Sequence, residues 1–367
     1  MAAKGKAYPR PNVRSVSPPM KTNFNHLKFF AVIAILAAFL LPRFAFARAS
    51  DANSALAVRK VVAPLGAGAT GAEIQAALDS LPDAGGEVVL PAGTFPVSRP
   101  IVLRRNNQAL CGVGRATILR LTDGANCPVV IMGEPVNQPR RTISHLQVSG
   151  LFIDGNRLHQ DQELWQRTSQ GTEIHNNGVT VQGVDDSVVT QVTCARCRSG
   201  GLVTTLGVRR LTVQNFEAFD NEFDGLACYL TKDCRFVNLN LHDNPGAGIS
   251  LDLDFDHNSV VNAVLTANDL GIFMRASCGN RFQNITIRRS RHFGVFIAQT
   301  EVATPQGCRP LAHSQCTDNL FTYMQATNCG GPAFHVNDSS CVNNVVANTT
   351  GGAGLNRGPR TAAHTAF

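Results

Sequence analysis

The sequence is poor in several residue types, and each scarcity limits what the protein can be. Tryptophan occurs once, tyrosine three times, and lysine only twice after residue 47, at Lys60 and Lys232. Residues 48–367 carry 26 basic and 26 acidic side chains and so have no net charge. Nucleic-acid-binding domains are usually basic, and disordered chains have few apolar residues, whereas 44% of this sequence is hydrophobic. We therefore expect a folded protein that binds no nucleic acid.

The formal charge of +7 belongs to the first 47 residues, which hold seven basic side chains and no acidic one. Within them, residues 29–41 (FFAVIAILAAFLL) form an apolar run of 13 residues, followed by the tripeptide Ala45-Phe46-Ala47. A basic segment, a short apolar segment and an A-x-A site are the three parts of a secretory signal peptide. The run falls short of the roughly 20 residues that span a bilayer. We expect cleavage near Ala47, a secreted or periplasmic protein, and no stable membrane insertion afterwards. An uncleaved anchor is the alternative.

All eleven cysteines follow this leader, and export would permit disulfides. Because the number is odd, at least one thiol stays unpaired. Cys308 and Cys316 bracket a short segment that contains proline and are the best candidate pair. Cys194 and Cys197 form a C-x-x-C motif, but the sequence has no second such motif to complete a zinc site.

From residue 177 onward the chain repeats a pattern of one glycine followed by alternating apolar residues. Spacings of 23, 24, 23, 23, 23 and 37 residues separate the glycines that begin the repeat, namely Gly178, Gly201, Gly225, Gly248, Gly271, Gly294 and Gly331. A second strand-like segment follows most of them, and asparagines recur between the segments. Alternation with a period of two indicates strands, and a repeat of about 23 residues built from short strands indicates a β-solenoid.

A helix is expected just before the first strands. Residues 71–81 (GAEIQAALDSL) place Ile74, Ala77, Leu78 and Leu81 on one face. A helix here would cover the first edge of the solenoid, where bare strands would otherwise recruit other chains. The expected organisation is a leader in residues 1–47, a segment with this capping helix in 48–86, the solenoid in 87–352 and a flexible tail in 353–367.

The N-terminal half carries a resemblance to a known family. The segment GATGAEIQAALDSLPDAGGEVVLPAGTF, then ILRLTDGA, LFIDGN and coils of the form GI-x-L, resembles the pectate-lyase-like superfamily over nearly all of residues 64–350. The resemblance implies an all-β fold, a single-stranded right-handed parallel β-helix. It also implies an exported protein that often acts on acidic, plant or bacterial polysaccharides as a lyase, hydrolase or epimerase, although some members have no known catalytic activity.

Residues at the same position of successive coils stack about 4.8 Å apart, so candidate sites are found by comparing coils. The first and third residues after the repeat glycine are mostly apolar and are expected to point inward. The fourth residue is expected to point outward. In successive coils this position includes four side chains that could bind or react with a substrate, namely Tyr229, Asp252, Arg275 and His335. The sixth adds a parallel row of Thr231, Asp254 and Ser277.

These residues suit a uronate lyase or C5-epimerase, which must neutralise the sugar carboxylate and remove the proton at C5. Arg275 would hold the carboxylate, Tyr229 would act as acid or base, and Asp252 would position a hydroxyl, with Asp254 and His335 as further binding residues. Asp252, Asp254 and Asp256 are alternatively candidate ligands of Ca²⁺, and no other cofactor is predicted.

Other functions stay open. Two carboxylates two residues apart would also serve a β-helix glycoside hydrolase. An aspartate beside an arginine on the next coil is equally an ordinary cross-strand pair, as in a non-catalytic glycan-binding or structural surface protein. Insertions at residues 157–176 and 301–317 are expected to wall a groove, in which Trp165 either stacks on a sugar or packs its loop against the solenoid. The expected partner is a polysaccharide or other glycan, and the protein is expected to be a monomer.

Overall fold

The computed structural model describes residues 65–167, 173–300, 312–351 and 355–357, all within the unit Leu56–Phe367. The predicted signal peptide lies outside these residues. Almost every described element is a strand, and the paired strands run parallel except in one hairpin. No helix in the described ranges is long and apolar enough to cross a membrane.

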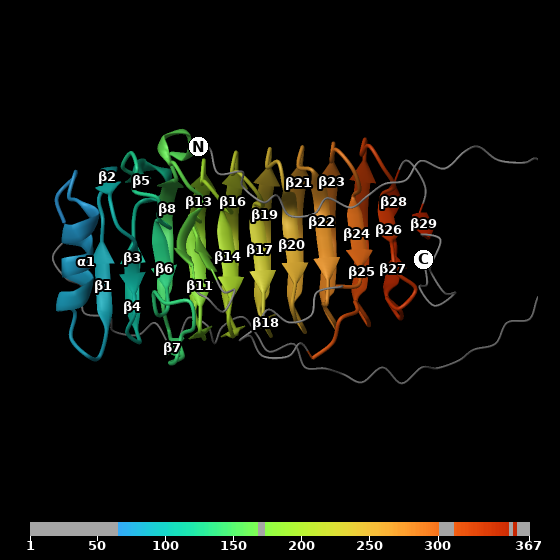
Figure 1. Ribbon diagram of the computed structural model, residues 1–367, viewed down its shortest axis with the longest axis horizontal. Helices are drawn as coiled ribbons and strands as arrows, with labels where there is room; N and C mark the ends of the chain where they lie inside the picture. Colours follow the sequence, from blue (N-terminus) through green and yellow to red (C-terminus); the bar gives the residue numbers. More distant parts are fainter. Residues whose placement is uncertain (1–64, 168–172, 301–311, 352–354, 358–367) are drawn as a thin grey trace, which may run out of the picture. The chain divides into compact units, whose positions relative to one another are not determined.

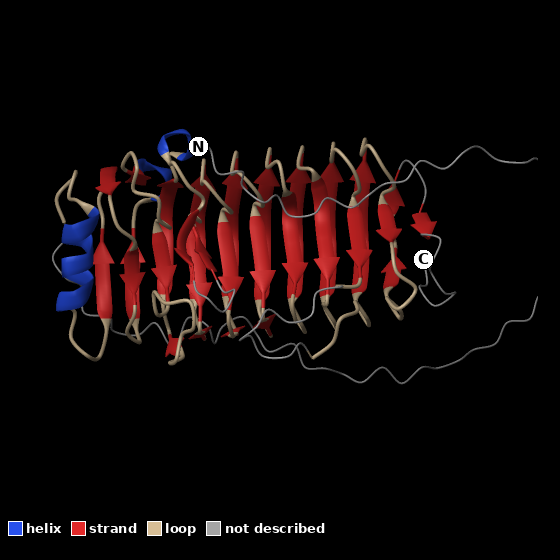
Figure 2. Ribbon diagram, viewed as in Figure 1, coloured by secondary structure: helices blue, strands red, loops and turns tan. Residues whose placement is uncertain are grey.

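Three parallel sheets share the coils of the solenoid (Figures 1 and 2). The long-strand sheet has the order β1 (Gly86–Val89), β4 (Gln108–Cys111), β8 (Gln147–Asp154), β13 (Val188–Ala195), β16 (Thr212–Phe219), β19 (Arg235–His242), β21 (Ser259–Thr266), β23 (Arg281–Arg288), β25 (Leu320–Thr327) and β27 (Val345–Ala347). Three further strands pair with it outside this order, namely β2 (Gly93–Val97), β5 (Thr117–Leu121) and β28 (Thr350–Gly351).

The short-strand sheet has the order β3 (Ile101–Leu103), β6 (Val130–Met132), β11 (Val179–Gln182), β14 (Leu202–Thr205), β17 (Leu226–Tyr229), β20 (Ala247–Asp252), β22 (Leu270–Arg275), β24 (Val295–Ala298), β26 (Phe334–Val336) and β29 (Leu355–Arg357). A small sheet follows it along each coil, formed by β7 (Ile143–Ser144), β12 (Val184–Asp185), β15 (Val208–Arg209) and β18 (Thr231–Lys232). An antiparallel hairpin stands apart, formed by β9 (Leu164–Arg167) and β10 (Glu173–His175). Short 3₁₀ turns lie at Gly114–Ala116 and Arg157–His159.

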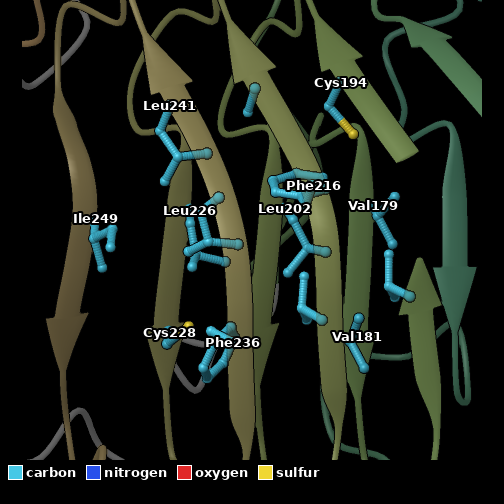
Figure 3. Close-up of a cluster of buried hydrophobic side chains, with 14 of the residues drawn as sticks. Val179, Val181, Cys194, Leu202, Phe216, Leu226, Cys228, Phe236, Leu241 and Ile249 are labelled. Carbon is cyan, nitrogen blue, oxygen red and sulfur yellow. The ribbon is translucent and has the colours of Figure 1, made fainter. Parts of the chain in front are cut away.

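Successive coils pair in register, and their apolar side chains form continuous inward rows. On the short-strand sheet, Leu226 lies between Leu202 and Ile249, and Val179 continues the row. All four are fully buried, and Figure 3 shows them packed with residues of the long-strand sheet such as Phe236. The predicted solenoid is confirmed, and so is the inward direction of the first residue after the repeat glycines from Gly178 to Gly294.

The long strands bend at a residue with left-handed backbone geometry, which changes the spacing of their inward residues. Asn238 has φ 55°, and in β19 the inward residues are Phe236, Leu239 and Leu241. Successive inward residues of a regular strand are two positions apart, whereas Phe236 and Leu239, on either side of the bend, are three apart. Asparagine tolerates this geometry better than most residues. Equivalent residues of other coils are Gln191, Asn215, Asn262, Asn284 and Tyr323. Corners of this kind explain one row of recurring asparagines, and a second row, Asn221, Asn244 and Asn268, is buried and hydrogen-bonded from coil to coil.

A close approach of neighbouring coils explains the repeat glycine. A Cβ atom on Gly178 would lie 2.6 Å from the carbonyl oxygen of Gly201 and 2.8 Å from the sulfur of Cys194. Both distances are well below van der Waals contact, so only glycine fits without a shift of the neighbouring coil.

The predicted capping helix is confirmed as α1 (Gly71–Ser80). It begins with a capping box, in which the Thr70 side chain accepts from the Glu73 N–H and the Glu73 carboxylate accepts from the Thr70 N–H. Ile74 and Leu78 are fully buried, and the helix contacts β1, β2 and β3 at the first end of the sheets (Figure 1).

Two boundaries differ from the sequence prediction. Residues 355–357 belong to the predicted flexible tail, but they form β29, which pairs in parallel with β26. Pairing at the last coil satisfies backbone groups that would otherwise form a bare edge. The first strand begins at Gly86, one residue before the predicted start of the solenoid. Cys308 lies outside the described residues, so its predicted disulfide with Cys316 stays a prediction.

Candidate functional site

Three of the predicted catalytic residues end adjacent strands of the short-strand sheet. Tyr229 pairs with Asp252 across β17 and β20, and Arg275 occupies the same position of β22. The Arg275 guanidinium donates a hydrogen bond to one carboxylate oxygen of Asp252, while the Leu253 N–H donates to the other at 2.8 Å. The structure therefore brings Tyr229, Asp252 and Arg275 together as one group.

Asp252 is enclosed, whereas its partner is partly open to solvent. The Asp252 side chain is 5% exposed and that of Arg275 is 31% exposed. Burial raises the pKa of Asp252, and the Arg275 guanidinium and the Leu253 N–H oppose that shift. Arg275 also lies over the ring of Phe273, with 5.1 Å between the guanidinium carbon and the ring centroid. The guanidinium is thus held between a carboxylate and an aromatic face.

The parallel row predicted at the sixth position does not face outward. Thr231 and Ser277 are fully buried and Asp254 is 5% exposed. The reason is a left-handed residue directly after the site column, as at Leu253 with φ 53° and Ala276 with φ 39°. This geometry reverses the alternation of side chains at the ends of β14, β17, β20 and β22. In the described coils that contain Tyr229, Asp252 and Arg275, these residues are consequently the last outward-facing polar residues before the turn.

His335 occupies a different column from the one predicted. It pairs with Phe296, the second residue after Gly294, rather than with Ala298. The residue equivalent to Gly294 is Ala333 and not Gly331, because Val295 pairs with Phe334. His335 therefore lies in an outward aromatic row beside the catalytic candidates, two positions closer to the start of its strand than predicted.

This aromatic row, which consists of Phe273, Phe296 and His335, was missed by the sequence reasoning. Phe273 and Phe296 stack with centroids 5.9 Å apart and an angle of 6°, and Phe296 stacks on His335 at 5.4 Å. Phe293 packs against both Phe296 and His335, at 5.2 and 4.8 Å. The sequence held part of the signal, because Phe273 and Phe296 are the second residues after Gly271 and Gly294, whereas His335 joins the row only through the shifted register after the second insertion. Aromatic side chains in a row offer stacking faces for the apolar faces of sugar rings.

Two buried nitrogen atoms in this region have no hydrogen-bond partner among the described residues. They are Nε of Arg275 and Nδ1 of His335. Buried donors and acceptors are usually satisfied, so unpaired ones mark a place where a polar ligand group would be stabilised. Burial lowers the pKa of His335, which favours the neutral imidazole.

The three aspartates proposed as calcium ligands do not gather into one site. Asp252 contacts Arg275, and Asp254 accepts the Ala312 N–H at 3.0 and 3.1 Å. Asp256 contacts Lys232 Nζ at 2.9 Å and His313 Nε2 at 2.8 Å. In the described ranges, their oxygen atoms do not form a cluster in which all lie within 4.8 Å of one another. Since cationic side chains or N–H groups already neutralise each carboxylate, this set does not fit Ca²⁺.

The two insertions differ in what they cover. Trp165, on β9, is partly buried and packs against the hydrophobic core, which corresponds to the alternative in which it secures its own loop. The Glu163 carboxylate lies 2.7 Å from Nδ1 of His175, and this contact links the two ends of the hairpin. Residues 301–311 of the second insertion lie outside the described residues, and residues 312–315 cover Asp254 and Asp256.

A separate groove of about 580 Å³ lies on the outer face of the long-strand sheet. Glu217 lines it and contacts Arg115 at 2.9 Å, Thr193 at 3.2 Å, Asn240 at 3.1 Å and His242 at 3.6 Å. Here Arg115 already has a carboxylate partner, and the groove contains an acidic side chain. In this respect it is like the group around Arg275, whose guanidinium also has a carboxylate partner, Asp252.

Comparison with known proteins supports the architecture. The family described as right handed beta helix region matches residues 139–269. The A-module of a mannuronan C-5 epimerase from Azotobacter vinelandii is 16% identical with a TM-score of 0.51, and the match covers 81% of this chain and 97% of the module. An alginate lyase from Paenibacillus is 10% identical with a TM-score of 0.53, with 84% and 99% covered.

A further similar structure is the N-terminal fragment of gene product 12 from bacteriophage Phi29, at 16% identity and a TM-score of 0.61. That match covers 76% of this chain and 49% of the fragment. No protein with a curated description matches the sequence. At these identities the similarity shows the fold alone. The chain has a right-handed parallel β-helix fold, which it shares with the epimerase module and the alginate lyase.

Proposed function

We propose that the protein is exported and acts on a uronate-containing polysaccharide as a lyase or C5-epimerase. The observation that carries the proposal is the group of Tyr229, Asp252 and Arg275 on adjacent strands, next to the aromatic row. A guanidinium binds a carboxylate, and aromatic faces stack on pyranose rings. The similarity in fold to a C-5 epimerase module and an alginate lyase supports the choice of these two reaction classes.

In this proposal Arg275 neutralises the carboxylate of the sugar. Its Nε–H has no acceptor among the described residues, while another nitrogen of the same guanidinium contacts Asp252. Asp252 thereby holds the guanidinium in place for the incoming carboxylate. Neutralising that carboxylate makes the proton at C5 more acidic, because the negative charge that develops on its removal spreads onto the carboxylate oxygens.

Tyr229 then transfers the proton. As the phenolate it removes the C5 proton from one face of the ring. In a lyase the bond from C4 to the glycosidic oxygen breaks, a C4–C5 double bond forms, and the departing oxygen takes up a proton. In an epimerase a proton returns to C5 from the opposite face and no bond of the chain breaks. Both outcomes begin with the same broken C–H bond.

Hydrolysis is less well supported. It would need Asp252 and Asp254 to face the same glycosidic bond. Asp254 is hydrogen-bonded to the Ala312 N–H of the second insertion, whereas Asp252 contacts Arg275 on the sheet, so the two carboxylates have different surroundings. Binding of a glycan without catalysis is the remaining alternative, and the experiment below separates it from the enzymatic ones.

The test is to incubate the full chain with a panel of uronate polymers and to follow three signals. Ultraviolet absorbance of the new double bond identifies a lyase, C5 inversion without absorbance identifies an epimerase, and new reducing ends without absorbance identify a hydrolase. We expect one of the first two signals, and we expect Tyr229→Phe and Arg275→Ala to reduce it at least about 100-fold. Tyr323→Phe and Arg288→Ala, at exposed positions of the long-strand sheet, are the matched controls.

Reducing ends alone, or binding with none of the three signals, would contradict the proposed activity. Export has a separate test, because N-terminal sequencing of protein recovered outside the cytoplasm is expected to begin near Arg48. Protein that keeps an intact leader would contradict cleavage.

A further inference from the structure

A second reactive group lies in the turns beyond the short-strand sheet, and neither the proposed mechanism nor the sequence reasoning uses it. Its centre is Cys278, whose sulfur lies 3.3 Å from Nδ1 of His313 and 3.2 Å from the hydroxyl of Thr317. The other imidazole nitrogen, Nε2, contacts Asp256 at 2.8 Å. Thiol, imidazole and carboxylate are thus connected in series, although Cys278 and His313 are 35 residues apart in the sequence.

The exposure of Cys278 also sets it apart. The other described cysteines are buried, with the exception of Cys329. Cys278 and Cys329 are both partly exposed, and the Cys329 sulfur donates to the Thr327 carbonyl at 3.7 Å. Among the cysteines that the structure describes, a reagent in solution therefore has access to two thiols, and Cys278 is the one with an imidazole beside it.

The arrangement suits proton transfer better than metal binding. Asp256, Cys278 and His313 offer ligand atoms within 4.8 Å of one another. However, the thiol and the carboxylate contact opposite nitrogens of the same ring, so the imidazole lies between the two atoms that one ion would have to join. The second oxygen of Asp256 contacts Lys232 Nζ at 2.9 Å, which places another positive charge beside the position that a cation would need.

The charges around His313 keep it ready to hold a proton. Hydrogen bonds with Asp256 and Cys278 raise the pKa of His313 to about 10, against the opposing effect of burial. Burial acts to raise the pKa of Asp256, but His313 and Lys232 outweigh it, so the net pKa of Asp256 is lowered. Asp254, whose oxygen lies 3.7 Å from Nε2 of His313, adds a further negative charge on the same side.

We infer that Cys278, His313 and Asp256 form a nucleophilic thiol site that undergoes exchange with small disulfides. At neutral pH His313 is protonated and places a positive charge beside the sulfur, so the Cys278 thiol loses its proton to solvent and the sulfur attacks one sulfur of the disulfide. A new S–S bond forms, the original S–S bond breaks, and the departing thiolate takes up a proton from His313, which regains one from solvent. The product is a mixed disulfide at Cys278 together with one small thiol, and the same reaction in reverse restores the thiol.

The backbone around Cys278 favours a disulfide over an ester as the reaction partner. Ester cleavage generates an oxyanion, which needs free N–H donors beside the nucleophile. The Cys278 N–H donates to Asp256 at 3.0 Å, and the Gly279 N–H donates to the Thr317 carbonyl at 3.0 Å. Both are occupied. Exchange with a disulfide develops no oxyanion and needs only the sulfur and a proton carrier.

The test compares the two partly exposed thiols within one protein. The full chain is treated with dithiodipyridine or oxidised glutathione at neutral pH, and labelling of Cys278 and Cys329 is followed by peptide mass spectrometry. Thiolates are the attacking species in this exchange, and the positive charge of His313 beside the Cys278 sulfur favours the attack relative to a thiol without such a neighbour. We expect Cys278 to react about tenfold faster than Cys329.

His313→Gln should bring the rate of Cys278 down to that of Cys329, and Thr317→Val should lower it by a smaller factor. Cys329→Ser is the matched control, which should leave labelling of Cys278 unchanged, and circular dichroism verifies that each variant keeps its strands. Equal rates for the two thiols in the wild type would overturn the inference. So would stoichiometric Zn²⁺ binding that protects Cys278, or an acyl-enzyme at Cys278 with an activated ester. None of these outcomes bears on the uronate reaction, which uses other residues.

Discussion

The contact between Arg275 and Asp252 offers a prediction whose size and pH dependence both come from the structure. The Asp252 side chain is 5% exposed, and Arg275 is its cationic partner. In Arg275→Met the carboxylate stays buried without that partner, which costs about 3 kcal/mol in the free energy of unfolding. In the double variant Asp252→Asn/Arg275→Met no charge is buried, so we expect it to recover most of this loss.

The pH dependence follows from the direction of the pKa shift. Burial already raises the pKa of Asp252 in the folded state, and removing Arg275 raises it further, since the guanidinium opposes the shift. A folded-state pKa above the unfolded value means that the folded protein binds more protons, so stability falls as pH rises between the two values. The stability gap between wild type and Arg275→Met should therefore be large near neutral pH and should narrow towards pH 4.

Urea unfolding followed by circular dichroism at several pH values measures both effects. Arg288→Met, at an exposed position of β23, serves as the control and should stay within about 0.5 kcal/mol of wild type. The reasoning is refuted if Arg275→Met is as stable as wild type at neutral pH. It is also refuted if acid leaves the gap unchanged, because the buried carboxylate would then not be the source of the loss.

Three further predictions concern the scaffold and its ions. Gly178→Ala should lose about 1–3 kcal/mol of stability, because its Cβ would lie 2.6 Å from the Gly201 carbonyl oxygen, and a normal thermal midpoint would contradict that close approach. Asn280→Ala should lower the free energy of unfolding by about 1–3 kcal/mol, because the buried Asn280 amide donates to Phe255 and Asn319 on the neighbouring coils. Asn240→Ala, at an exposed position, should lower it by only a few tenths of a kcal/mol. Equal losses would contradict a stabilising role of the buried asparagine contacts. Chelation with EDTA should leave the thermal midpoint unchanged, and a fall restored by Ca²⁺ would show that the three aspartates do bind the ion.

The architecture was predictable because it repeats. A glycine every 23 or 24 residues, followed by alternating apolar residues, indicates coils of constant length, and the close contact at Gly178 gives the reason for the glycine. The same register placed Tyr229, Asp252 and Arg275 on adjacent strands. Inference from one coil to the next is reliable as long as no insertion interrupts the count.

The site was predictable only in part, for two local reasons. After the second insertion the chain re-enters the sheet with Ala333 where the pattern suggested Gly331, which moves His335 by two positions into the aromatic row. The turn after each short strand uses a left-handed residue such as Leu253, and leucine carries no sequence signal for that geometry. The position of Asp254 was therefore predicted wrongly.

The repeat pattern could not predict the group around Cys278. His313 belongs to an insertion that no other coil contains, so no register relates it to Cys278 or Asp256. Only the path of the folded chain brings these residues together. Pairings of this kind depend on tertiary structure and not on a local pattern.

The most direct test of the proposed function is exchange at C5 of the sugar. Uronate polymers are incubated with the protein in D₂O, and deuterium at C5 is measured by NMR or mass spectrometry. The C4–C5 double bond of an elimination product is measured separately by ultraviolet absorbance. Removal of the C5 proton by Tyr229 predicts C5 exchange or elimination with at least one polymer, lost in Tyr229→Phe and retained in Tyr323→Phe. A panel in which every polymer keeps its C5 proton, or in which Tyr229→Phe is as active as wild type, would contradict the account.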